Sequence, residues 1–292
     1  MDKRSDRFER DGQVIAYDIA GDGPPVLLLH GFPQCRAMWH GILPPLVERF
    51  TCVTADLRGY GESLCAGGVS AMSFREMAAD QVALMAHLGF ERFHLVGHDR
   101  GGRVAHRLTL DHGAAVASLT LMDIVPTHLL LSELRHDVAR AYYHWFFLAQ
   151  RGGLPEHMIG LDPDTYYESC LTGWGKDGLA AFDAEALEIY RSHWRKPEVI
   201  ASMCDDYRAA IDLDMGHDAE DLDRRVPCPA LVLYGAEGLM AEAYDVGACW
   251  QDRLAQMQAR AVPGGHFFPD THPRETAAAL LDFLPHPDRR QP

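Results

Sequence analysis

The sequence predicts an α/β fold with a mostly parallel sheet, into which a helical segment is inserted. Two observations lead to this prediction. Short apolar runs typical of buried strands alternate with helical segments in residues 1–125, and strand signals return after residue 215. Between these parts, residues 126–214 show aromatic-rich helical patterns in place of strand signals. We therefore expect a core formed by residues 1–125 and 215–292, with residues 126–214 as a helical cap.

The predicted strands are short apolar runs bounded by turn residues. They comprise residues 14–17, 26–29, 52–55, 93–96 and 116–122 in the first part, and 229–234 and 261–262 in the second. Strands that are apolar on both faces are typical of a parallel sheet covered by helices.

The predicted core helices alternate with these strands. Residues 73–88 begin with Ser73 and Glu76 in the spacing of a capping box and continue with apolar residues at helical spacing. Residues 101–112 form a second helical pattern. In the proposed cap, residues 133–150 and 184–195 are aromatic-rich and helical in pattern.

Composition excludes several classes of function. The 292-residue chain has 42 acidic and 27 basic side chains, a net charge of −15, and so repels nucleic acid and anionic membrane surfaces. No apolar run approaches the roughly 20 residues that a membrane helix needs. The charged start differs from a signal peptide, so we expect a cytoplasmic protein. The seven cysteines are scattered without a C-x-x-C motif, which argues against a thiolate metal site.

The segment F-H-L-V-G-H-D-R-G-G-R has the form of a nucleophile elbow with Asp99 in the central position. A strand leads into Gly97-His98-Asp99-Arg100-Gly101, and a helix follows. Glycines beside the central residue permit a tight turn that exposes its side chain near the positive end of the helix. This position suits an anionic nucleophile.

Other segments supply partners for Asp99. The segment L-L-L-H-G-F-P-Q follows a strand, so the backbone N–H groups of Phe32 and of Arg100, which follows Asp99, are candidate oxyanion-hole donors. His266 lies in the late loop V-P-G-G-H-F-F, and Asp123 ends a predicted strand. Glu237, after a later strand, is a rival to Asp123 as the acid that orients the histidine.

These motifs resemble the α/β-hydrolase superfamily and, within it, the fluoroacetate dehalogenases. The resemblance extends through the motifs HGFPQ, DLRGYGES, GHDRGGR, HWFF, DPDTYYESCLTGWG, CDDYRAA and PGGHFF. It implies the α/β-hydrolase fold with an inserted helical cap. It also implies a homodimeric enzyme, free of cofactor and metal, that hydrolyses a small anionic 2-haloacid, with fluoroacetate as its characteristic substrate.

The resemblance implies a role for each matching residue. Asp99 would be the nucleophile, His266 the general base and Asp123 its orienting acid. The other implied site residues are Arg100 and Arg103 for the substrate carboxylate, His144, Trp145 and Tyr207 for the halide, and Trp174 beside the substrate.

Chemistry independently favours an aspartate at this elbow. A serine that attacked a saturated carbon would leave an ether that water does not readily cleave, whereas a carboxylate leaves an ester with an attackable carbonyl. Arg100 and Arg103 stand at i and i+3 at a helix start, so both can face one substrate carboxylate. Surface salt bridges are the alternative role for these arginines, but an arginine adjacent to the elbow nucleophile does not easily avoid the pocket, so we favour contacts with the substrate. Core packing is the usual role of residues such as His144, Trp145 and Tyr207 in an aromatic-rich helix.

Two other functions remain open at this point. An epoxide hydrolase also uses an elbow aspartate together with cap tyrosines, and the candidates here are Tyr142, Tyr143, Tyr166, Tyr167 and Tyr190. Against it, an arginine beside Asp99 favours an anionic substrate. The second alternative is a non-catalytic ligand-binding protein on the same scaffold, because a fold does not guarantee activity.

Overall fold

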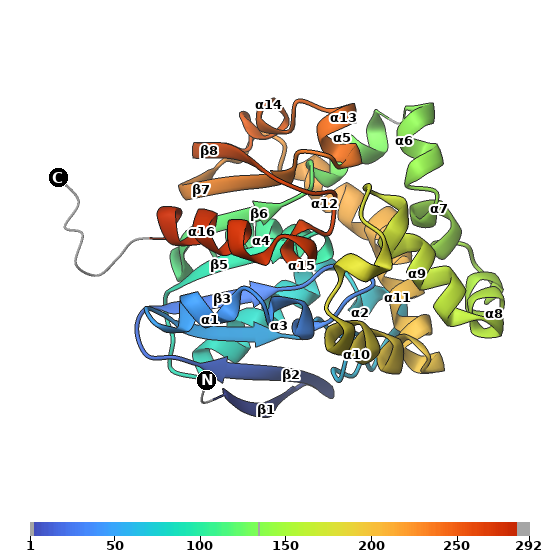
Figure 1. The fold of residues 1–292 in the computed structure, drawn as a ribbon, viewed down its shortest axis with the longest axis horizontal. Helices are drawn as coiled ribbons and strands as arrows, with labels where there is room; N and C mark the ends of the chain where they lie inside the picture. The colour runs from blue at the N-terminus through green and yellow to red at the C-terminus, as the bar shows by residue number, and fades with distance from the viewer. Residues whose placement is uncertain (1–2, 134, 285–292) are drawn as a thin grey trace.

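The computed structural model describes residues 3–133 and 135–284. An eight-stranded sheet crosses this part of the chain in the order β1-β2-β4-β3-β5-β6-β7-β8 (Figure 1). The strands are β1 (Lys3–Arg10), β2 (Gln13–Ala20), β3 (Pro25–Leu29), β4 (Thr51–Ala55), β5 (Phe93–His98), β6 (Val116–Met122), β7 (Val226–Gly235) and β8 (Leu254–Val262). From β4 to β8 all neighbours are parallel, whereas β1 and β2 pair antiparallel. The predicted fold class is confirmed.

Helices of the core pack on both faces of the sheet. Helix α1 lies beside α16 on one face, and α3 lies beside α4 on the other (Figure 1). The core helices and 3-10 turns are η1 (Arg36–Trp39), α1 (Leu43–Val47), α2 (Gly68–Ala71), α3 (Phe74–His87), α4 (Arg100–Asp111), η2 (Gly113–Ala115), α13 (Leu239–Ala243), α14 (Val246–Trp250), α15 (Phe268–Thr271) and α16 (Pro273–Phe283). The Ser73 side chain accepts a hydrogen bond from the Glu76 backbone N–H, so α3 begins at the predicted cap.

In the sequence, a set of helices lies between β6 and β7. These helices pack together beside the sheet, on the right of Figure 1. These cap helices are α5 (Thr127–Ser132), α6 (His136–Ala141), α7 (His144–Leu148), α8 (Leu154–Leu161), α9 (Pro163–Gly173), η3 (Leu179–Ala181), α10 (Ala184–Trp194), α11 (Pro197–Ala209), the π-helical turn η4 (Ala210–Asp214) and α12 (Met215–Glu220). The run from α11 through η4 to α12 is helical without a break, so the predicted boundary between residues 214 and 215 falls inside it.

The helical pattern of residues 133–150 is divided between two helices, α6 and α7. The chain leaves the helical conformation at Tyr142, which ends α6, and restarts at α7. This break lets His144 and Trp145 turn inward and become buried, while Tyr143 stays exposed. The burial of aromatic rings overrides the helical periodicity of the segment.

The sequence prediction missed the edge strand β1 and most of the edge strand β8. Strand β1, with the sequence KRSDRFER, is polar and largely exposed, and β8 is exposed along most of its length. Edge strands need no apolar run because water covers one side, so apolar periodicity misses them.

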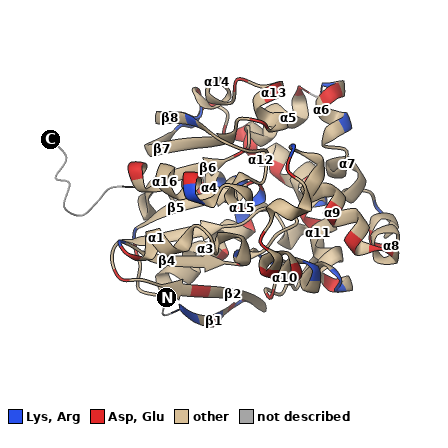
Figure 2. Ribbon diagram, in the orientation of Figure 1, with Lys and Arg blue, Asp and Glu red and all other residues tan. Residues whose placement is uncertain are grey.

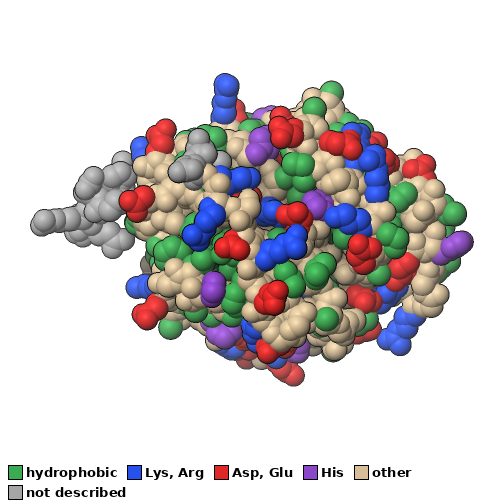
Figure 3. All heavy atoms as spheres, turned by 90° about the horizontal axis from the view of Figure 1, so that it is seen from below, with side chains coloured by type: hydrophobic (Ala, Val, Ile, Leu, Met, Phe, Trp, Pro, Cys, Tyr) green, Lys and Arg blue, Asp and Glu red, His purple; other side chains and the backbone are tan. Residues whose placement is uncertain are grey.

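The surface carries both signs of charge. Acidic and basic residues are spread over the core and the cap in Figure 2, and they are interspersed on the face shown in Figure 3. Among the described residues, no helix combines the length and apolarity needed to cross a membrane.

A buried carboxyl group joins the core to the cap. Asp270, in α15, accepts hydrogen bonds from the Tyr190 hydroxyl of α10 (2.8 Å) and from the Gln34 side-chain amide. Burial raises the pKa of Asp270 to about 7, although both of these hydrogen bonds favour the ionised form. The nearby carboxylate of Asp183 raises this pKa further.

This raised pKa predicts a pH-dependent stability. A carboxyl group with a higher pKa in the folded state stabilises the fold below about pH 4, and this stabilisation is lost as the pH rises towards 7, by up to about 1.4 kcal/mol per pH unit. The Asp270→Asn variant lacks this titration. We expect its melting temperature to improve relative to the wild type between pH 5 and pH 7.5. An equal difference at both pH values in thermal unfolding would contradict this assignment.

Candidate active site

Asp99 occupies a strained turn between β5 and α4. Its φ is +47°, a left-handed conformation that costs a non-glycine residue roughly 1–3 kcal/mol. The turn closes because Gly97 and Gly101 carry no side chain. A Cβ on Gly97 would overlap the backbone of Gly101, and a Cβ on Gly101 would overlap the backbone at the end of β3. The sequence thus folds into the predicted elbow.

The Asp99 carboxylate has two different oxygen environments. Its Oδ1 accepts a hydrogen bond from the Phe32 backbone N–H at 2.9 Å. Its Oδ2 lies 3.9 Å from Nε2 of His266. One oxygen is therefore held by the loop after β3, while the other faces the imidazole.

His266 is held in orientation by Asp123. Its Nδ1 lies 2.7 Å from Asp123 Oδ2, and the other oxygen of Asp123 accepts from the Gly235 N–H at 2.9 Å. Because a carboxylate only accepts, Nδ1 donates and Nε2 keeps a bare lone pair. Nε2 is buried and has no hydrogen-bond partner among the described residues. The side chain is thus arranged to take a proton on the side that faces Asp99.

Glu237, the rival acid, lies elsewhere. Its side chain is 49% exposed and stands 3.8 Å from Lys176 on the surface. By contrast, Asp99, Asp123 and His266 are at most 5% exposed. The structure therefore brings together Asp99, Asp123 and His266.

The electrostatics keep Asp99 ionised. Burial alone would raise its pKa, but the neighbouring imidazoles and the guanidiniums of Arg100 and Arg103 lower it to about 2. Burial also lowers the pKa of His98 to about 4, so that ring is neutral near pH 7 and its Nε2 donates to the His266 carbonyl at 2.9 Å. The guanidiniums of Arg100 and Arg103 supply positive charge beside Asp99 near pH 7.

Both predicted arginines are buried next to the elbow. The Arg100 guanidinium binds the Asp206 carboxylate through Nε (2.8 Å) and Nη2. Arg103 donates from Nη1 to the Val125 carbonyl (3.1 Å) and to the Thr127 hydroxyl (3.0 Å). Burial lowers the pKa of Arg103 to about 10, which still leaves it charged near neutral pH.

Three predicted cap side chains form an aromatic wall over the elbow. The Trp145 ring lies 5.0 Å from Arg100 Cζ and 4.8 Å from Arg103 Cζ, and Tyr207 meets Trp145 edge-on at 5.3 Å. His144 packs 5.4 Å from Tyr207. The Tyr207 hydroxyl and Nδ1 of His144 are buried polar atoms without a hydrogen-bond partner in the described residues. Orphaned groups of this kind are available to a bound ligand.

Trp174 connects the cap to the histidine loop. Its ring lies 4.3 Å from His144 and 5.3 Å from His266, and its carbonyl accepts from the His266 N–H at 3.2 Å. The next residue, Gly175, touches Gly265 so closely that a Cβ on either would overlap the other's backbone. Trp174 is thus placed beside the base, with its indole N–H bound to the Ala141 carbonyl at 3.1 Å.

Sequence reasoning missed Asp206 and Tyr60. Asp206 holds Arg100, and the Tyr60 hydroxyl donates to Asp206 at 2.6 Å. Both residues lie within quoted motifs, DLRGYGES and CDDYRAA. However, two adjacent aspartates beside a tyrosine give no signal of which one pairs with residue 100.

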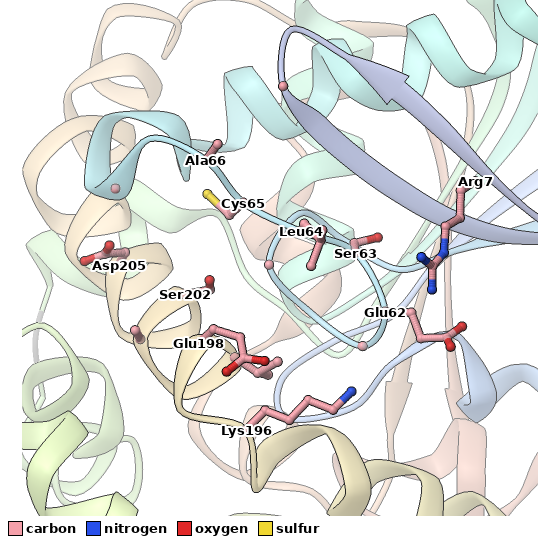
Figure 4. Close-up of a pocket in the computed structure, with 16 residues that line it drawn as sticks. Arg7, Glu62, Ser63, Leu64, Cys65, Ala66, Lys196, Glu198, Ser202 and Asp205 are labelled. Carbon is pink, nitrogen blue, oxygen red and sulfur yellow. The ribbon is translucent and has the colours of Figure 1, made fainter.

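One cavity of the described residues lies outside this site. It is a groove of about 610 Å³ between α11 and the loop after β4, where Glu198, Ser202 and Asp205 stand opposite Glu62 and Arg7 (Figure 4). None of the predicted site residues lines it. In the described part of the chain, no cluster of three or more His, Cys, Asp or Glu residues is arranged to hold a metal ion.

The chain belongs to the α/β-hydrolase fold family, whose sequence pattern matches residues 24–273. It is 52% identical to a fluoroacetate dehalogenase from Burkholderia sp., over 91% of this chain and 88% of that protein. It is 30% identical to a soluble epoxide hydrolase from Corynebacterium sp. (strain C12), over 94% of each chain. Among solved structures, an alpha/beta hydrolase from Nostoc sp PCC 7120 superimposes with a TM-score of 0.95 at 45% identity, over 98% of this chain and 99% of that one.

Proposed function

We propose that this enzyme is a haloacetate dehalogenase, which hydrolyses fluoroacetate or a related short 2-haloacid to the 2-hydroxyacid and halide. The observation that carries this proposal is a carboxylate nucleophile, Asp99, set beside two buried guanidiniums, Arg100 and Arg103. A carboxylate can displace a halide from saturated carbon, and the guanidiniums suit a substrate that is itself a carboxylate. The 52% identity to a fluoroacetate dehalogenase supports this function.

In the first step, Asp99 attacks the carbon that bears the halogen. Oδ1 is engaged by the Phe32 N–H, which leaves Oδ2 as the attacking oxygen. The new C–O bond forms as the carbon–halogen bond breaks, and the halide leaves with the bonding electron pair. The pKa of about 2 keeps Asp99 ionised and ready to attack. An ester of Asp99 results.

In the second step, water cleaves this ester. The 3.9 Å between His266 Nε2 and Asp99 Oδ2 supports this step, because the ester would form at that oxygen. His266 takes a proton from water as the water oxygen attacks Cγ of Asp99. The Phe32 N–H, and that of Arg100, stabilise the oxyanion at Oδ1. Collapse then expels the hydroxyacid oxygen, which takes the proton from His266, and Asp99 ionises again.

Arg100 and Arg103 bind the substrate carboxylate in this proposal, and the cap receives the halide. Fluoride is a strong hydrogen-bond acceptor, and the His144, Trp145 and Tyr207 side chains offer N–H and O–H donors. The Tyr207 hydroxyl has no hydrogen-bond partner among the described residues, which supports this assignment, because a buried donor without a partner costs free energy unless a ligand uses it. Trp174 forms a wall of the substrate pocket.

Removal of the Tyr207 hydroxyl tests the halide site. We expect Tyr207→Phe to slow fluoroacetate turnover about tenfold and chloroacetate turnover much less, because fluoride depends more on donated hydrogen bonds. The melting temperature should not fall, since the lost hydroxyl has no partner among the described residues. Rates of fluoride and chloride release measure this difference.

The control is Tyr166→Phe, which removes another buried hydroxyl without a partner in the described part of the cap. It should leave both rates unchanged. Equal losses on both substrates in Tyr207→Phe would show that the residue packs the site and does not bind halide.

A direct assay distinguishes the candidate functions. Fluoride release from fluoroacetate and 2-fluoropropionate, and chloride release from chloroacetate, are expected from the proposed enzyme. Diol formation from an epoxide without halide release would instead indicate an epoxide hydrolase. The 30% identity to the Corynebacterium enzyme supports this alternative function. Saturable haloacetate binding without turnover would indicate a binding protein.

The proposed enzyme is a homodimer in the cytoplasm. In its support, α8 exposes Leu154, Met158 and Leu161 at spacings of four and three, which places them on one face of the helix. All seven cysteines are described and none forms a disulfide, as expected in a reducing compartment. Sedimentation of the purified protein tests the proposed homodimer, and a monomer at micromolar concentration would contradict this proposal.

A further inference from the structure

Arg100 is fixed on every side but one. Its guanidinium makes three hydrogen bonds to Asp206, through Nε and Nη2 to the carboxylate and through Nη2 to the carbonyl at 3.1 Å. The Tyr207 ring lies 4.3 Å and the Phe74 ring 4.6 Å from Cζ. Only Nη1 is left as a buried donor with no partner among the described residues.

Asp206 is itself held in place from the core. Its Oδ2 accepts from both Arg100 Nε and the Tyr60 hydroxyl, which is 2.6 Å away. Arg100 stands in α4 of the core, Asp206 in α11 of the cap, and Tyr60 in the loop that follows β4. All three side chains are fully buried. The hydrogen bonds among Tyr60, Asp206 and Arg100 therefore fix the orientation of Arg100 through one residue of the cap and one of the core.

The two arginines differ in charge balance. The carboxylate of Asp206 compensates Arg100, whose pKa is lowered by burial but raised overall by that carboxylate. The hydrogen bonds of Arg103 in the described residues go to a backbone carbonyl and a hydroxyl, which carry no charge. Arg100, Arg103 and Asp206 together carry one net positive charge, and the ionised Asp99 beside them brings the sum of the four side chains to zero. A second negative charge on a substrate would therefore meet no cation that is left to compensate it.

We propose that Asp206 is a positioning and specificity-determining residue, which aims the free Nη1 of Arg100 at the substrate carboxylate and limits the pocket to substrates with a single negative charge. The inference rests on the proposed function of this same site. Asp206 acts through Arg100 and does not touch the substrate. Tyr60 supports Asp206 in its orientation.

The test compares Asp206→Asn with the wild type. The asparagine amide cannot accept both arginine donors, so Arg100 reorients, and we expect kcat/KM for fluoroacetate to fall about 10²-fold. The variant also loses one negative charge beside the site. Inhibition by malonate, a dianion, should therefore strengthen at least tenfold relative to inhibition by glycolate, a monoanion. A merely structural role would not change this inhibition ratio.

Two further variants keep the result interpretable. Asp80→Asn removes another buried carboxylate that binds an arginine through two oxygens, Arg58 at 2.7 Å, and should leave the inhibition ratio unchanged. Tyr60→Phe removes only the support of Asp206 and keeps its charge. We expect it to lower kcat/KM roughly threefold to tenfold at an unchanged malonate to glycolate ratio.

The outcomes separate this inference from the proposed function. Wild-type protein that releases no fluoride from fluoroacetate refutes the function itself. An active wild type, with Asp206→Asn retaining wild-type kcat/KM and inhibition ratio, refutes only the role of Asp206. If Asp206→Asn does not fold, Tyr60→Phe decides: unchanged kinetics in that variant would overturn the positioning network.

Discussion

Replacement of His266 by asparagine is expected to stop the enzyme after its first chemical step. Asp99 needs no base to attack carbon, but hydrolysis of its ester needs water activated at Nε2 of the histidine. Sustained halide release should fall by about 10³-fold or more. Each active site should release at most one halide and gain the mass of one carboxymethyl group, mapped to the peptide that contains Asp99. Intact-protein mass spectrometry after mixing with chloroacetate measures this stall.

His157→Asn is the matched control, because His157 lies exposed in α8 and should turn over like the wild type. Sustained turnover in His266→Asn, or modification of a residue other than Asp99, would overturn the covalent assignment. A folded variant that neither releases halide nor gains mass would also count against it, because the first step needs no base.

Arg103→Lys is expected to lower kcat/KM for haloacetates about 10²-fold. A lysine cannot bind a substrate carboxylate with two planar donors while it also donates to Val125 and Thr127. The substitution also lowers the positive charge at position 103. Burial already lowers the pKa of the arginine to about 10, and the ordinary pKa of lysine is about two units lower than that of arginine. A lysine at this position would therefore lose part of its positive charge near pH 8.

The pH profile of kcat/KM checks this second effect. Activity of Arg103→Lys should recover in part as the pH falls from 8 to 6, where the lysine regains its proton, whereas the wild type should not show this gain. Arg151→Lys is the control and should match the wild type, since Arg151 lies on the exposed surface and pairs there with Asp212 at 3.0 Å. Wild-type kinetics in Arg103→Lys would remove Arg103 from the site.

The elbow was predictable because its cause is local. Gly97 and Gly101 are required by close backbone contacts within a few residues and with β3, and the glycine pattern in the sequence reflects this requirement. The interior strands were predictable for a similar reason, since each is a continuous apolar run. The edge strands β1 and β8 and the break at Tyr142 depend on solvent exposure and on ring packing between distant segments, which periodicity does not report.

The partners of the site residues were less predictable than the residues themselves. The choice between Asp123 and Glu237 depended on which acid the fold brings to His266, and only the structure gives the 2.7 Å contact of Asp123. The ion pair between Arg100 and Asp206 joins residues 106 positions apart. Long-range pairs of this kind arise from the packing of cap on core and have no local sequence signal.

The close approach of Gly175 and Gly265 has a consequence for chain length. The cap backbone lies directly against the loop that carries His266, and the His266 N–H is bound to the Trp174 carbonyl. A bulkier substituent on the carbon that Asp99 attacks would push the cap outward and so pull the imidazole away from the ester. We expect bulky 2-haloacids to release their halide and then remain attached to Asp99, so the protein would discriminate against them by slow hydrolysis of this ester even where they bind and react.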